Sequence, residues 1–69
     1  MKLLDVVALT QDVPEKGLRR GQVGTIVETL ASGVFEVEFC DLDGRTYVSV
    51  ALPEGHLMLL HHEPASAVA

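Results

Sequence analysis

The chain has 69 residues, 48% of them hydrophobic, and a formal net charge of −5, so it is long enough for one small domain with its own core. The acidic balance disfavours nucleic-acid binding, which usually needs a basic surface, and the single cysteine, Cys40, excludes an intramolecular disulfide. No segment has the pattern of a signal peptide or a membrane span, and we therefore expect a soluble, cytoplasmic protein.

Turn residues divide the chain into short segments rich in Val, Leu and Ile, which is typical of strands. The predicted strands, in chain order, are residues 3–9, 23–30, 34–39, 45–52 and 57–60. A long polar loop spans residues 10–22, and residues 53–56 suit one turn of 3₁₀ helix. We expect a domain over residues 1–62 and a flexible C-terminal tail over residues 63–69.

The stretch GLRRGQVGTIVETL opens the second predicted strand and has the form of a glycine-rich loop. A phosphate-binding loop needs a helix directly after its glycines, so that helix N–H groups face the phosphate. Here a β-branched run follows Gly24, and no GK[ST] signature is present. We therefore interpret Gly21 and Gly24 as a corner where the chain turns into a bent strand.

The third and fourth strands predict a hairpin whose register can be counted from Asp43 and Gly44, taken as the two central turn residues. The apolar pairs on one face are then Phe39 with Val48, Val37 with Val50, and Phe35 with Leu52. The pairs on the other face are Glu38 with Ser49, Glu36 with Ala51, and Cys40 with Tyr47. Turn chemistry and hydrophobic pattern therefore predict the same hairpin.

The second strand is ambiguous, because a bulge or the length of the turn over residues 31–33 would decide whether Ile26, or Thr25 with Val27, points inward. We favour Ile26 and Leu30 as core residues, with Val27 partly buried. The predicted core consists of Val7, Leu9, Leu18, Val23, Ile26, Phe35, Val37, Phe39, Val48, Val50, Leu52 and Leu57. Five short strands of this kind predict an all-β fold, a small SH3-like five-stranded barrel with a short 3₁₀ turn before the last strand.

Catalytic and metal chemistry find little support in the sequence. His56, His61 and His62 with Cys40 have the chemistry of zinc ligands, but adjacent histidines on a strand point to opposite faces and no CxxC or HxxxH pattern exists. Cys40 has no histidine placed beside it, and Glu36 and Glu38 lack a pocket in which one carboxyl would become a general acid. We therefore expect no enzyme activity, no metal and no cofactor.

Binding is the remaining class of function. Glu36, Glu38, Asp41 and Asp43 crowd one hairpin around Tyr47. We interpret this aromatic ring and the acids around it as a docking patch for another, basic protein. The same acids would also serve as a solubilising edge that blocks strand-to-strand aggregation.

A basic loop is the alternative binding surface. Lys16, Arg19 and Arg20 form the one positive cluster, and they would contact nucleic acid or an acidic partner. The open edges of a small barrel would also allow homodimerisation.

Three motifs, LLDVVALTQDVPEKGLRRGQVGTIVE, VFEVEFCDLDGRTYVSVALP and HLMLL, together resemble a family of short bacterial proteins described only as a domain of unknown function. The G-x-x-G-x-I piece is also similar to the corner of SH3-like barrels in ribosomal and transcription-factor modules and in small enzyme subunits. The resemblance implies an SH3-like barrel and no activity. By analogy with small acidic bacterial proteins that look like partners of toxins or of larger subunits, we expect a non-catalytic protein-interaction module, either an accessory subunit or an antitoxin-like partner.

Overall fold

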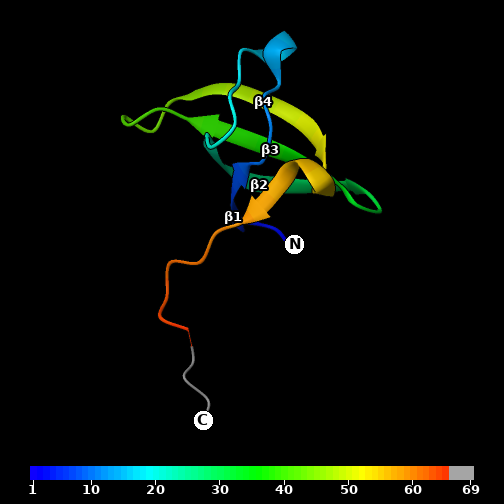
Figure 1. Cartoon of the computed structure of the whole chain (residues 1–69), viewed down its shortest axis with the longest axis vertical. Coiled ribbons are helices and arrows are strands. Elements are labelled where there is room, and N and C mark those ends of the chain that lie inside the picture. The colour runs from blue at the N-terminus through cyan, green and yellow to red at the C-terminus, as the bar shows by residue number, and fades with distance from the viewer. Residues whose placement is uncertain (66–69) are drawn as a thin grey trace.

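The computed structural model describes residues 1–65 and contains five antiparallel strands in one sheet (Figure 1). The strands are β1 (Val6–Leu9), β2 (Val23–Ala31), β3 (Val34–Cys40), β4 (Thr46–Pro53) and β5 (Leu57–Leu59). Two 3₁₀ turns, η1 (Pro14–Lys16) and η2 (Glu54–His56), lie in the loop after β1 and directly before β5. The prediction of an all-β fold with a 3₁₀ turn before the last strand is confirmed, whereas η1 was not predicted.

The strand order is β4-β3-β2-β1-β5, so β2, β3 and β4 form a meander and β1 lies between β2 and β5. The sheet does not close into a barrel, because β4 and β5 are its two edges and are not paired with each other. The chain after β5 leads away from the sheet in Figure 1. Of the predicted tail, residues 66–69 lie outside the described residues. Within residues 1–65, no helix has the length and hydropathy of a membrane span.

One face of the curved sheet carries the core, and the loop between β1 and β2 covers part of it. The buried cluster consists of Val7, Leu9, Val13, Leu18, Ile26, Phe35, Val37, Phe39, Leu52 and Leu57. Val48 and Val50 are partly buried and pack against it, as their predicted pairing requires. Val13 and Leu18 form an isolated bridge, with Val13 N donating to Leu18 O at 2.9 Å, and this bridge folds the polar loop over the core.

Two core predictions in β2 are wrong, because Val23 and Leu30 are 48% and 45% exposed. Gly24 takes the inward position next to Val23, and a Cβ there would lie 2.7 Å from Val37 Cγ1. The strand thus alternates Gly24 in, Thr25 out and Ile26 in, which places Val23 on the outer face. The glycine motif is explained by close packing at Gly24 and by a left-handed φ of 91° at Gly21.

The β3–β4 hairpin has the predicted register in its body and a different turn. Phe39 pairs with Val48, Val37 with Val50, and Phe35 with Leu52, and the outer pairs Glu38–Ser49 and Glu36–Ala51 are also present. The turn differs because Gly44 N donates to Asp41 O at 3.0 Å and Asp41 N donates to Arg45 O at 2.9 Å, with Gly44 at a φ of 81°. This is a three-residue loop with a glycine bulge, not the predicted two-residue loop.

A second bulge, in β4, restores the pairing of apolar with apolar residues. A loop with an odd number of residues would otherwise place apolar side chains opposite polar ones. Cys40 pairs with Thr46, and the register shifts between Phe39 and Cys40, so Tyr47 is the extra residue. The predicted Cys40–Tyr47 pair is therefore wrong, while the apolar pairs below it are correct.

The first strand begins later than the predicted residue 3, because residues 2–5 form a turn. Asp5 N donates to Lys2 O at 3.1 Å, and Lys2 N donates to Asp5 Oδ2 at 2.8 Å. Leu4 has a φ of 70°, which lies in the left-handed region that favours glycine. Its N–H donates to Ile26 O at 2.7 Å, so this turn packs beside β2.

Candidate functional site

Glu36 and Glu38 lie on the outer face of β3, opposite the side that carries Phe35, Val37 and Phe39. Both are half-buried, because the neighbouring strands flank them. Ser49 Oγ donates to Glu36 Oε2 at 2.6 Å, and Cys40 Sγ lies 3.8 Å from Glu38 Oε1. Among residues 1–65, the donors on these two carboxylates are thus a hydroxyl and a thiol, and no cationic side chain compensates their charge.

Glu28 of β2 is a third member of this surface, and sequence reasoning missed it. The register shifts between Ile26 and Glu28, so Val27 is the extra residue of a bulge and Glu28 pairs directly with Glu36. Like charges directly opposite each other on neighbouring strands destabilise a sheet. We call Glu28, Glu36 and Glu38 the acidic face. The pattern of β2 allows a bulge, which would bring Glu28 to this face, but nothing in the sequence fixes the position of the bulge.

Asp41 and Asp43 lie in the hairpin turn and not on the strands. Asp41 Oδ1 accepts from Asp43 N at 2.9 Å and from Arg45 N at 3.0 Å. Its carboxylate therefore holds the turn together, which is a structural role that an Asp at this position commonly has. Asp43 is exposed at the turn.

Tyr47 was predicted beside the acids, and the bulge places it elsewhere. Thr46 takes the position next to Cys40, where its Oγ1 lies 3.6 Å from Cys40 Sγ. The Tyr47 hydroxyl accepts from Gln22 Nε2 at 2.9 Å, and Gln22 Oε1 in turn accepts from Arg19 N. The structure thus brings Tyr47 to the loop before β2 and separates it from the acidic face.

Lys16, Arg19 and Arg20 are exposed in the loop between β1 and β2. Arg20 N donates to Asp12 Oδ1 at 2.8 Å, so a carboxylate is built into the same loop. Together with Glu15 in η1, Asp12 gives residues 12–20 two acidic side chains beside the three cationic ones. The loop is therefore a mixed-charge surface, not a continuous basic footprint.

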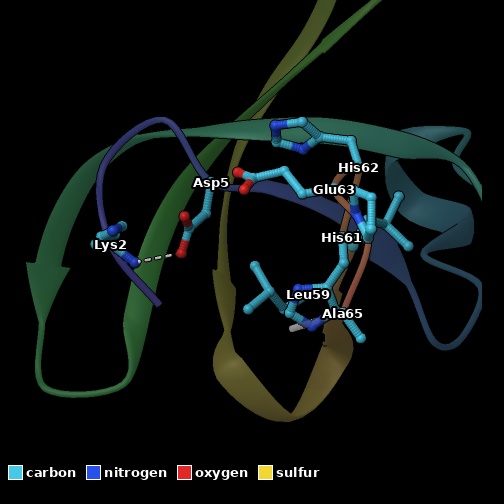
Figure 2. Close-up of a pocket in the computed structure, with 9 residues that line it drawn as sticks. Lys2, Asp5, Leu59, His61, His62, Glu63 and Ala65 are labelled. Atoms are coloured by element: carbon cyan, nitrogen blue, oxygen red, sulfur yellow. Dashed lines mark hydrogen bonds between the residues drawn. The ribbon is translucent and has the colours of Figure 1, made fainter. Parts of the chain in front are cut away.

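Surface hollows of the described residues include one beside the N-terminal turn and one beside η1. One, of about 660 Å³, is lined by Lys2, Asp5 and residues 59–65, and Figure 2 shows the Lys2–Asp5 hydrogen bond on one side of it and His61, His62 and Glu63 on the other. The other lies between the η1 loop and β4 and includes His56, whose Nδ1 is buried without a hydrogen-bond partner. Within residues 1–65, no three His, Cys, Asp or Glu side chains are close enough to hold a metal ion.

Comparison with known proteins gives one match. The family model of a domain of unknown function, DUF4926, matches residues 3–59. The match runs from the turn before β1 to the end of β5 and so contains all five strands. No curated protein and no solved structure matches the chain.

Proposed function

The chain belongs to the DUF4926 family, and we propose that it is a non-catalytic protein-interaction module whose acidic face binds a basic partner protein. A small accessory subunit or an antitoxin-like partner would act in this way. The proposal uses Glu36 and Glu38 as predicted, adds Glu28, and leaves Asp41 and Tyr47 to the turn and the loop.

The Glu28–Glu36 pair is the observation that carries the proposal. Two glutamates directly opposite each other cost about 0.2–1 kcal/mol of sheet stability relative to a neutral pair. Glu38 adds a third carboxylate two residues, about 7 Å, along the same face of β3. A Lys or Arg side chain of a partner that docks over these groups would convert this repulsion into attraction, and the net charge of −5 would favour its approach.

The chain layout also supports a finer proposal for the fold, an SH3-like arrangement. A long loop after β1, the β2–β3–β4 meander and η2 before a short β5 follow one another in that order. Val13 and Leu18 of the loop after β1 belong to the core cluster, and β4 and β5 are the two edges of the sheet. Small modules of this shape are suited to presenting a sheet face or a loop to a partner.

The alternative, a nucleic-acid-associated module that uses Lys16, Arg19 and Arg20, has weaker support. Asp12 accepts from the backbone of Arg20 within the same loop, and the acidic face would repel phosphates. Binding of RNA that weakens steeply with salt and disappears in the Arg19→Ala/Arg20→Ala variant would favour this alternative.

A short synthetic peptide of lysine and serine tests the acidic face. Its affinity for the protein is measured by titration calorimetry at low salt. The variant Glu28→Gln/Glu36→Gln/Glu38→Gln should lose about tenfold in affinity, since three ion pairs at the protein surface contribute about 0.5 kcal/mol each. The matched control Glu15→Gln/Asp43→Asn/Glu63→Gln removes the same charge from exposed sites elsewhere. Equal losses in both variants would show only a general charge effect and would contradict the proposal.

A further inference from the structure

The outer face of the sheet continues beyond the acidic face into an exposed apolar area. Ala8 of β1 pairs with Val23 on one side and with Met58 of β5 on the other, so these three side chains form a row across three strands. Val23 is 48% and Met58 is 52% exposed, while Ala8 between them is buried. We call Val23, Met58, Val6 and Leu60 the apolar half of the outer face.

The next row joins the apolar half to the acidic face. Leu60 N donates to Val6 O at 2.9 Å, Val6 pairs with Thr25, and Thr25 pairs with Glu38. Glu38 pairs in turn with Ser49 of β4. This row runs across the sheet from Leu60, directly after β5, to Ser49 of β4. Its aliphatic end at Leu60 and the Glu38 carboxylate are three strand spacings apart, about 14 Å. Val6 and Leu60 are half-buried and Val23 and Met58 more exposed, so the aliphatic end is open to contact.

We propose that the occupant of this outer face is a cationic segment of another protein that carries aliphatic side chains next to Lys or Arg. The inference rests on the proposed function and deepens it by naming the chemistry of the partner. The aliphatic side chains would cover Val23 and Met58, and the cations would lie over Glu38, Glu36 and Glu28. Charge complementarity selects this occupant over a second copy, because each copy carries a net charge of −5 and the same glutamates.

Three short synthetic peptides distinguish the parts of the proposal: lysine–leucine, lysine–serine of equal charge, and glutamate–leucine. The lysine–leucine peptide should bind the full chain about tenfold more tightly than the lysine–serine peptide, because partial burial of aliphatic side chains adds to the charge term. The glutamate–leucine peptide should bind at least about tenfold more weakly than the lysine–leucine peptide.

The apolar half is tested by Val23→Thr/Met58→Gln, which keeps side-chain shape and strand propensity at two exposed positions. This variant should lose most of the preference for leucine over serine. Leu42→Gln is the matched control, because Leu42 is fully exposed in the hairpin turn and lies outside the outer face. Thermal unfolding of each variant checks that the fold is intact.

Equal affinity for the lysine–leucine and lysine–serine peptides, both dependent on the glutamates, would overturn this inference and leave the proposed function standing. Lack of binding by any lysine peptide would overturn both. A wild-type dimer by sedimentation, made monomeric by Val23→Thr/Met58→Gln, would show that a second copy covers the apolar half and would also overturn the inference.

Discussion

The two faces of β3 show how one strand serves two purposes. Phe35, Val37 and Phe39 on the inner face are at most 4% exposed and belong to the buried core cluster. Glu36 and Glu38, which alternate with them, are half-buried on the outer face and carry charges that no cationic side chain of residues 1–65 compensates. Packing therefore determines the inner residues, whereas on the outer face Glu36 lies opposite the like charge of Glu28.

The largest expected effect comes from the inner face. Phe39→Ala should lower the free energy of unfolding by about 3–5 kcal/mol, because Phe39 is fully buried and its loss leaves a cavity. Glu38→Ala, one residue away on the outer face, should change it by about 0.5 kcal/mol or less. Urea titration followed by circular dichroism measures both.

A complete loss of structure in Phe39→Ala would prevent a measurement, so Phe39→Leu provides a milder change of about 1–1.5 kcal/mol. Similar losses for Phe39→Leu and Glu38→Ala would contradict the division between the faces.

The next effect concerns the inward glycine of β2. Gly24→Ala should lower the free energy of unfolding by about 1–3 kcal/mol, because the new Cβ would lie 3.0 Å from Glu38 O and closer still to Val37. Gly55→Ala is the matched control, since nothing lies within 4 Å of a Cβ at that position. If both variants unfold at the same urea concentration, close packing does not explain the glycine motif.

The smallest effect is a gain in stability on the outer face. Glu28→Gln should raise the free energy of unfolding by about 0.2–1 kcal/mol at low salt, because it removes the like charge opposite Glu36. The gain should fall away near 1 M salt, where the screening length is about 3 Å. Glu15→Gln, in exposed η1, should show little change at either salt concentration. A gain that persists at high salt would point to a cause other than repulsion.

The sequence predicted those parts of the fold in which two independent signals agree. In the β3–β4 hairpin, alternation in VFEVEF and in the following strand allowed only one register of apolar pairs, and that register is present. The turn was predicted wrongly, because a left-handed glycine is compatible with two- and three-residue loops, and the bulge at Tyr47 restores the same parity. The three-residue loop and the bulge at Tyr47 cancel each other, so together they do not change which residues share a face. The hydrophobic pattern therefore does not reveal either of them.

The candidate site was predicted in part for a related reason. Glu36 and Glu38 follow from the alternation of β3, but Glu28 and Val23 depend on β2, whose pattern fits more than one register. Gly24 has no side chain to reveal which face it occupies, so the sequence pattern does not exclude Val23 from the core. Tyr47 was placed by an ideal pairing that the bulge breaks. The position of a bulge depends on tertiary packing, which a single sequence does not display.

The hydrogen bond between Tyr47 and Gln22 provides an intrinsic spectroscopic reporter. The chain has one tyrosine and no tryptophan, so its near-ultraviolet emission comes from a ring whose hydroxyl joins the fourth strand to the loop before the second. Opening of that junction should change the emission without any dye or engineered label. Circular dichroism follows global unfolding, so a change of emission without a change of dichroism is a local optical signal for motion of the longest loop.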